Sequence, residues 1–127
     1  MRILLVDDHV LMRCSLAHLL RLEADLQVVG EAGDGQQAIE LTRELMPDVV
    51  LMDISMPGMN GIDATRTIHA EAPGVTVIGL SMYEPREQAQ PMLDAGAAGY
   101  VSKTDAPEVL LAAIRACQRS LPPPGTA

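Results

Sequence analysis

The sequence is poor in aromatic residues: it has no Trp, no Phe and two Tyr among its 127 residues. Hydrophobic residues still make up 48% of the chain, and eight of them are Met. This share argues against a disordered chain and is enough for an aliphatic core that needs no metal or disulfide to hold it together. The length fits one domain and is too short for two.

Basic residues are also scarce, with nine Lys and Arg against 17 Asp and Glu, a formal net charge of −8. Such a chain repels a phosphate backbone, so we expect no direct binding of nucleic acid by this segment. An acidic cleft that holds a divalent cation is a better use of the charge. No apolar run approaches the ~20 residues of a membrane span. The run Ile3–Val6 meets Asp7 too soon for a signal peptide, so we expect a cytoplasmic protein with no membrane contact.

Cysteine is rare as well, and Cys14 and Cys117 are the only two. Their separation fits no metal-binding motif. In a cytosolic protein a disulfide between them is disfavoured, and we expect two buried free thiols.

Five short apolar runs recur along the chain, and most are continuous rather than alternating, which is typical of strands covered on both faces. They are Ile3–Val6, Gln27–Val29, Val49–Met52, Val75–Leu80 and Ala98–Val101. Between them lie stretches with helical spacing, and the first of these contains Leu11, Ser15, Leu19 and Leu20. The alternation predicts a single α/β domain with a parallel sheet and helices on both faces.

Helix boundary signals agree with this pattern. Asp34 can cap the second helix, and Pro47 ends it before the third strand. Asp105 and Glu108 have capping-box spacing for the last helix, and Gly96 suits the left-handed position that ends a helix. An interior proline removes a helical hydrogen bond, so Pro91 predicts a short, kinked or late-starting fourth helix that is mobile relative to its neighbours.

Polar residues with chemical potential follow the predicted strands at their carboxyl ends. Asp7 and Asp8 follow the first strand, Asp53 ends the third, Ser81 the fourth, and Lys103 follows the fifth. Ligands bind at this edge of an open parallel sheet, and clustered carboxylates favour a hard cation such as Mg²⁺. Each acid alone has a structural alternative: Asp8 as a helix cap and Asp53 as a turn residue. Their coincidence at one edge favours a site.

The chain resembles the receiver domain of two-component response regulators, most closely the NarL/FixJ-type (LuxR-family) subgroup. The motifs that carry the likeness are Leu5-Val6-Asp7-Asp8-His9, Asp48–Asp53, Met56–Gly61, Leu80-Ser81 and Ala95–Lys103. The resemblance implies a doubly wound, five-stranded parallel sheet in the flavodoxin-like order 2-1-3-4-5. It covers residues 1–119, and the Pro-rich residues 120–127 are predicted to begin a linker.

Carried over residue by residue, the resemblance makes Asp53 the phosphoryl acceptor. It implies that Mg²⁺, or Mn²⁺ in its place, is held by Asp53, Asp8, Asp7 through a water, and the backbone carbonyl of Ser55. Lys103 would bind the phosphoryl group, and Ser81 and Tyr100 would act as the switch pair. Ser55 and Tyr83 occupy positions that flank the path of the hydrolytic water.

The implied partners are a sensor histidine kinase, which donates the phosphoryl group, and a C-terminal helix-turn-helix DNA-binding domain that this chain lacks. The resemblance also allows a homodimer. No turnover of an external substrate is expected. The alternatives are a stand-alone receiver that acts through protein contacts, a haloacid-dehalogenase-like phosphohydrolase, and a flavodoxin-like flavin binder. Ser55 in place of an acid disfavours the phosphohydrolase, and Asp7 and Asp8 would repel a flavin phosphate.

Overall fold

Strands and helices alternate along the whole chain in the computed structural model, which describes residues 1–54, 61–81, 86–102 and 106–120. The strands are β1 (Arg2–Val6), β2 (Gln27–Ala32), β3 (Val49–Asp53), β4 (Thr76–Ser81) and β5 (Gly99–Ser102). The helices are α1 (Val10–Arg21), α2 (Gly35–Leu45), α3 (Gly61–Glu71), α4 (Arg86–Asp94) and α5 (Pro107–Ser120). In the described part of the chain, no helix is long and apolar enough to cross a bilayer.

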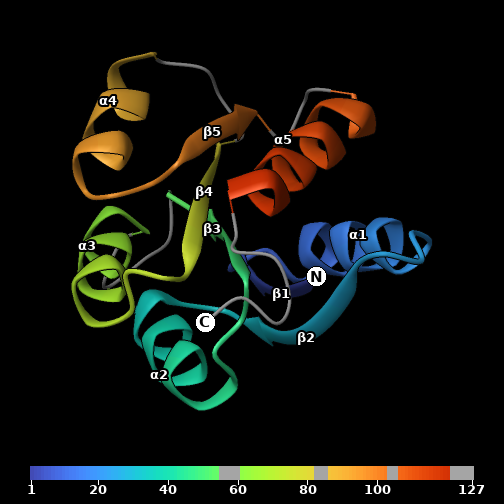
Figure 1. Ribbon diagram of the computed structural model, residues 1–127, viewed down its shortest axis with the longest axis horizontal. Helices are drawn as coiled ribbons and strands as arrows, with labels where there is room; N and C mark the ends of the chain where they lie inside the picture. The colour runs from blue at the N-terminus through green and yellow to red at the C-terminus, as the bar shows by residue number, and fades with distance from the viewer. Residues whose placement is uncertain (55–60, 82–85, 103–105, 121–127) are drawn as a thin grey trace.

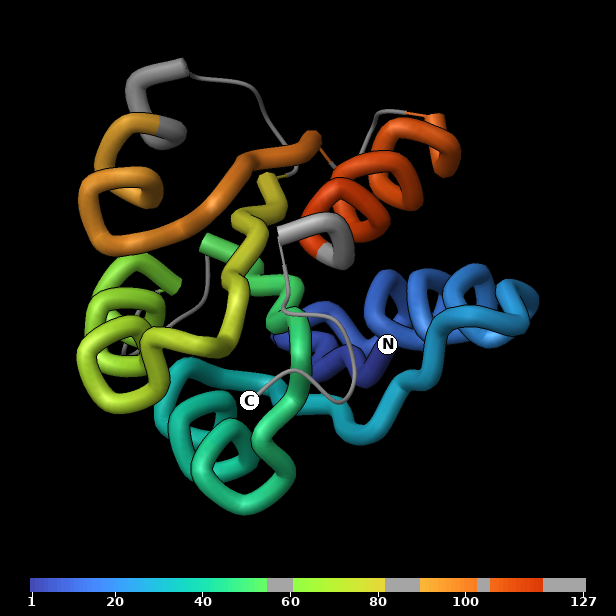
Figure 2. Tube along the Cα trace, viewed as in Figure 1, coloured from blue at the N-terminus to red at the C-terminus, as the bar shows by residue number. Residues whose placement is uncertain are grey.

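All strand pairs are parallel, and their order is β2-β1-β3-β4-β5, which confirms the predicted fold class. Figure 1 shows α1 and α5 on one side of the sheet and α2, α3 and α4 on the other. The tube in Figure 2 shows the same three layers without the ribbons. The sheet is therefore covered on both faces.

Alternate residues of each central strand enter different halves of the core. Leu4 and Val6 of β1 pack in the cluster on the α2–α3–α4 side. Ile3 and Leu5 pack in the cluster on the α1–α5 side. Because strand side chains alternate between the faces, a strand covered on both faces needs an unbroken apolar run. This is why β1, β3 and β4 were recognisable from the sequence.

Strand β2 is longer than predicted, since it continues past Val29 to Ala32. It lies at the edge of the sheet and is only partly buried, so its polar residues masked its strand character. Its register with β1 also shifts between Ile3 and Leu4, which are opposite Val28 and Gly30. A one-residue shift of this kind breaks the pattern that sequence reasoning relies on.

Two predicted helix boundaries are confirmed. The Asp34 carboxylate accepts a hydrogen bond from the Gln37 backbone N–H at 2.7 Å and caps α2. Gly96 has φ of +116°, in the left-handed region. The end of α2 uses Met46, also left-handed at φ 45°, one residue before Pro47. The predicted capping box of α5 involves Asp105, which lies outside the described residues.

Helix α1 differs from the prediction in three respects. Its N-cap residue is His9, so Asp8 is not the helix cap. Its inward face is formed by Ala17 and Leu20, whereas Leu11 is 84% exposed. Cys14 is exposed, so the prediction of two buried thiols is wrong for this residue; Cys117 is buried, and both cysteines are free.

Helix α4 is short, as Pro91 predicted: its nine residues make it the shortest of the five described helices. Pro91 lies inside the helix, which continues through it to Asp94. The Pro91 carbonyl accepts a hydrogen bond from the Ala95 N–H at 3.0 Å. The helix therefore continues past an interior proline rather than ending at it.

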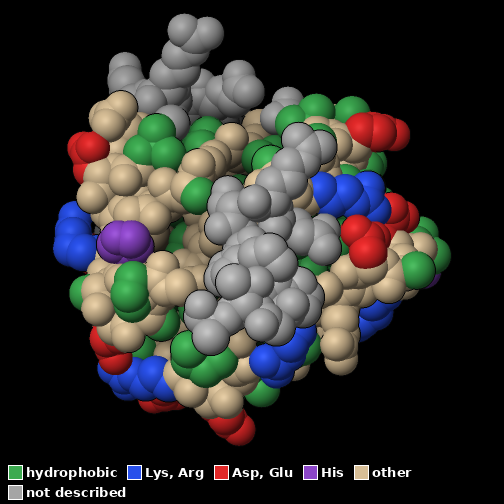
Figure 3. Space-filling model, viewed as in Figure 1, with side chains coloured by type: hydrophobic (Ala, Val, Ile, Leu, Met, Phe, Trp, Pro, Cys, Tyr) green, Lys and Arg blue, Asp and Glu red, His purple; other side chains and the backbone are tan. Residues whose placement is uncertain are grey.

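Arg115 connects α5 to the segment between α1 and β2. Its guanidinium donates hydrogen bonds to both carboxylate oxygens of Asp25, at 3.1 and 3.0 Å, and to Glu23 at 2.7 Å. Figure 3 shows basic and acidic side chains beside one another on the side of the molecule that carries α1 and α5. The hydrogen bond from Arg115 lowers the pKa of Asp25 below its ordinary value of 3.8.

We expect Arg115→Gln to lower the midpoint of urea unfolding at pH 7, with a difference from wild type that shrinks on acidification. Because the folded-state pKa of Asp25 is depressed, its contribution is present above the unfolded pKa and is lost as the pH falls through the folded pKa. Urea titrations at pH 7 and pH 3 measure this. Arg66→Gln, which removes an exposed i,i+3 pair with Asp63, is the control with little expected change. A difference that stayed constant with pH would contradict the role of Asp25.

Candidate functional site

The strand register brings the predicted site residues to one edge of the sheet. Val6 is opposite Met52, so Asp7 follows β1 at the level of Asp53 on β3. Asp53 is opposite Leu80 of β4, one residue before Ser81. Ser81 is in turn opposite Ser102, the residue before Lys103. The carboxyl ends of four strands therefore converge, as the sequence predicted.

An acidic cluster occupies this edge. Asp7, Asp8, His9 and Asp53 each place one potential ligand atom within 4.8 Å of all the others. The side chain of Asp7 is fully buried, Asp53 is 1% exposed and the Asp8 side chain is 24% exposed. Like charges this close repel each other strongly out of bulk water. The cluster therefore favours a bound cation.

The separations suit one small cation. With metal–oxygen distances near 2.1 Å in an octahedron, ligand oxygens lie about 3 to 4 Å apart. Among the described residues, Oδ1 of Asp8 is buried without a hydrogen bond of good geometry. Its polar neighbour is the ring Nδ1 of His9 at 3.2 Å. A buried carboxylate oxygen without a well-formed hydrogen bond is costly, and a metal ion would satisfy it. The residues present thus fit a hard divalent cation.

His9 also belongs to this cluster, although it was not among the predicted site residues. Its backbone N–H donates to Oδ1 of Asp7 at 2.9 Å. Its ring Nδ1 lies 3.3 Å from Asp7 and 3.2 Å from Asp8, while the side chain is 60% exposed. His9 caps the site from the solvent side. Its place directly after two acids at a strand end was the available signal.

Two further residues near the cluster had no predicted role. Gly61, at the start of α3, lies directly against the backbone of Asp53, and a side chain there would collide with the Asp53 carbonyl. Arg13 of α1 donates a hydrogen bond from Nη1 to the Asp7 carbonyl at 2.8 Å. Each contact joins the end of a strand to the helix that follows it, so the sequence pattern does not indicate which backbone atom Arg13 or Gly61 meets.

Of the two predicted switch residues, Ser81 lies on β4, next to the strand of Asp53, and Tyr100 lies one strand further away on β5. Ser81 is 1% exposed at the end of β4. Tyr100 of β5 is opposite Gly79, and its ring packs over that glycine: a Cβ at position 79 would lie 3.3 Å from Cδ2 of Tyr100. Tyr100 is half-buried against the core on the α2–α3–α4 side. Lys103, Ser55 and Tyr83 lie outside the described residues.

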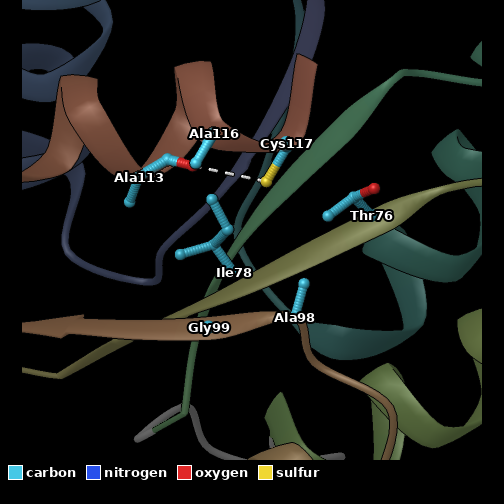
Figure 4. Close-up of a pocket in the computed structure, with 7 residues that line it drawn as sticks. All are labelled: Thr76, Ile78, Ala98, Gly99, Ala113, Ala116 and Cys117. Atoms are coloured by element: carbon cyan, nitrogen blue, oxygen red, sulfur yellow. Dashed lines mark hydrogen bonds between the residues drawn. The ribbon is translucent and has the colours of Figure 1, made fainter. Parts of the chain in front are cut away.

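A hollow of about 300 Å³ lies away from this cluster, between α5 and the start of β4 and β5, at the opposite end of the sheet from Ser81. It is lined by Thr76, Ile78, Ala98, Gly99, Ala113, Ala116 and Cys117 (Figure 4). Within it the Cys117 thiol donates to the Ala113 carbonyl at 3.4 Å, and burial raises the pKa of the thiol. A protonated thiol among alanines is a poor nucleophile, so the acidic edge remains the candidate site.

A doubly wound parallel sheet with a buried aspartate beside paired aspartates at its carboxyl edge defines a class of α/β proteins with an acidic site suited to a cation. Residues 3–115 match the family model of the response regulator receiver domain, so the chain belongs to that family. It is 40% identical over 121 residues to the transcriptional regulatory protein LiaR of Bacillus subtilis, and 42% identical over 115 residues to the nitrate/nitrite response regulator NarP of Escherichia coli. These alignments cover 95% and 91% of this chain.

A solved structure agrees. A LuxR-family two-component response regulator from Aurantimonas has a TM-score of 0.90 at 38% identity, over 94% of this chain and 86% of the other. The resemblance to the NarL/FixJ-type (LuxR-family) subgroup is therefore confirmed. The chain spans about half the length of its curated relatives, 57% of LiaR and 54% of NarP.

Proposed function

We propose that this receiver domain takes a phosphoryl group from a phosphohistidine of a sensor histidine kinase onto Asp53. The observation that carries the proposal is the buried position of Asp53 within one cluster with Asp7 and Asp8, in a chain that belongs to the receiver family. An Asp53 oxygen attacks phosphorus, the bond from phosphorus to the histidine nitrogen breaks, and an acyl phosphate results. Water later hydrolyses it to phosphate and the free carboxylate.

Mg²⁺ would supply charge neutralisation for this transfer, and Mn²⁺ could replace it. Asp53 and Asp8 would hold the ion directly, Asp7 through a water, and the Ser55 carbonyl would add a further ligand. Lys103 would bind the phosphoryl oxygens, since its predecessor Ser102 ends β5 beside Ser81. The protein assists its own modification without turning over an external substrate.

The output of the phosphorylation is proposed to be a shift in population at the face of α4, β5 and α5. Ser81 would move to donate a hydrogen bond to the phosphoryl group, and Tyr100 would enter the space it leaves. Ser55 and Tyr83 would tune the lifetime of the acyl phosphate through their place beside the hydrolytic water. Tyr100→Ala should then weaken the phosphorylation-dependent change in partner affinity.

The cellular setting is part of the same proposal. We place residues 1–119 in the receiver domain and residues 120–127 at the start of a linker to a C-terminal helix-turn-helix domain, because the curated relatives are about twice as long. DNA binding would belong to that domain rather than to this acidic segment. The protein would act in the cytoplasm, and a homodimer is a further expected partner state. A stand-alone receiver is the alternative.

Incubation with beryllium fluoride or acetyl phosphate tests the proposal. In the presence of Mg²⁺, a receiver forms one adduct per chain at Asp53, detectable by mass spectrometry and by NMR shifts around the cluster. Chelation of Mg²⁺ should prevent the adduct. Continuous release of phosphate without a stoichiometric adduct would indicate a phosphohydrolase instead. The absence of both an adduct and phosphate release would refute the proposal.

A further inference from the structure

Asp7 is held by hydrogen bonds at its backbone N–H, its side chain and its carbonyl, and the carbonyl is part of the peptide group that leads to Asp8. The Asp7 N–H donates to the Ala32 carbonyl at 3.0 Å, which extends the β1–β2 pairing by one residue. The Asp7 carbonyl accepts a hydrogen bond from Nη1 of Arg13 at 2.8 Å. The Asp7 side chain accepts from the His9 N–H at 2.9 Å. These contacts fix the backbone from which the side chain of the next residue, Asp8, projects.

The Arg13 guanidinium is itself fixed. Its Nε donates to Oε1 of Glu31 on β2 at 3.2 Å, and its side chain is 20% exposed. Gly33 leaves room for it, since a Cβ there would lie 3.3 Å from Nη1 of Arg13. Arg13 thus joins α1 and β2 to the carbonyl that precedes the Asp8 carboxylate.

We infer that Arg13 is a positioning residue for the cation site: it orients the Asp7–Asp8 peptide so that the Asp8 carboxylate is aimed at the ion before the ion arrives. The inference rests on the proposed cation-dependent function. Preorganised ligands bind more tightly because the cost of ordering them is met during folding. The positive charge of Arg13 also offsets part of the repulsion among the carboxylates.

The same helix offers a matched control. Arg21 of α1 approaches the other carboxylate oxygen of Glu31 at 3.6 Å, and within the described residues this is its one ion pair. It therefore shares the helix, the charge and the Glu31 partner with Arg13. It lacks the hydrogen bond to Asp7.

The experiment is a titration of the full chain with Mg²⁺, followed by NMR shifts of the Asp8 and Asp53 amides, for wild type, Arg13→Met, Arg13→Gln, Arg13→Lys and Arg21→Met. Arg13→Met and Arg13→Gln should raise the Kd for Mg²⁺ roughly tenfold, the scale found for residues that orient metal ligands. Adduct formation at saturating Mg²⁺ should change far less. Arg13→Lys, which keeps the charge and one donor, should recover part of the affinity, and Arg21→Met should match wild type.

The outcomes are distinguishable. A wild-type chain that binds no Mg²⁺ would refute the proposed function itself. If the wild type binds Mg²⁺ and the Arg13 variants have the same Kd, only the positioning role is overturned. An equal loss of Mg²⁺ affinity in Arg21→Met would overturn it as well. Arg13→Met keeps the apolar stem and Arg13→Gln keeps a donor, so the test survives if one of them fails to fold.

Discussion

Asp53→Asn is expected to abolish formation of the phosphoryl and beryllofluoride adducts while it raises the stability of the fold. The first effect follows because an amide cannot act as the attacking carboxylate. The second follows because Asp53 is 1% exposed and shares its cluster with two other carboxylates. Removing one of three mutually repelling charges should stabilise the folded chain by about 1–3 kcal/mol when no cation is bound.

Intact-protein mass spectrometry after incubation with acetyl phosphate and Mg²⁺ measures the first effect, and urea unfolding without divalent cations measures the second. Mg²⁺ should stabilise the wild type more than the variant, because a ligand that binds the folded state shifts its unfolding equilibrium. Asp63→Asn is the control, since Asp63 is an exposed aspartate on α3 that pairs with Arg66. A phosphoryl adduct on Asp53→Asn would place the acceptor elsewhere and remove the basis of the proposed function.

The central fold was predictable because a strand covered on both faces must be apolar at every position. Val49–Met52 and Ile3–Val6 have this pattern, and both are fully buried. The half-exposed end of β2 carries Gly30 and Glu31 and therefore escaped prediction. The order of the strands came from the family resemblance, since the residue pattern alone leaves more than one right-handed arrangement.

The cluster was predictable to the extent that its members stand at strand ends. Asp7, Asp8 and Asp53 follow or end apolar runs, and parallel strands bring such ends to one edge. The contacts of Arg13 with Asp7 and of Gly61 with Asp53 were not predictable, because they depend on how a helix packs against the strand end. A sequence pattern indicates on which face of a helix or strand a residue lies. It does not indicate which backbone atom of another element that residue contacts.

Gly61→Ala is expected to destabilise the fold and to impair the site, even though glycine here is not needed for a left-handed backbone. A Cβ at this position would collide with the Asp53 carbonyl oxygen and lie 2.7 Å from Cα of Ile54 and 2.9 Å from the Asp53 carbonyl carbon. All three are backbone atoms of β3 and its continuation, so no side chain can rotate away to make room. The structure must move α3 or the end of β3.

Each of these two elements is also held by hydrogen bonds of its own, which limits how far either can move. The Gly61 carbonyl accepts a hydrogen bond from the Thr65 hydroxyl at 2.6 Å, and the Ile54 N–H bonds to the Leu80 carbonyl at 3.2 Å. Overpacking in such a place typically costs 1–3 kcal/mol or more, so we expect a loss of about 3 kcal/mol in urea unfolding. The displaced Asp53 should also slow adduct formation strongly at saturating Mg²⁺.

Gly74→Ala supplies the matched control for this substitution. A Cβ at position 74 meets nothing within 4 Å, and the gain in chain stiffness should leave stability unchanged or raise it by up to about 1 kcal/mol. Suppose that Gly61→Ala had the same urea unfolding midpoint as Gly74→Ala and formed the beryllofluoride adduct equally fast. The contact between Gly61 and Asp53 would then not determine the position of the Asp53 carboxylate. The expected contrast instead means that the start of α3 sets the place of the Asp53 carboxylate, as Arg13 is inferred to set that of Asp8.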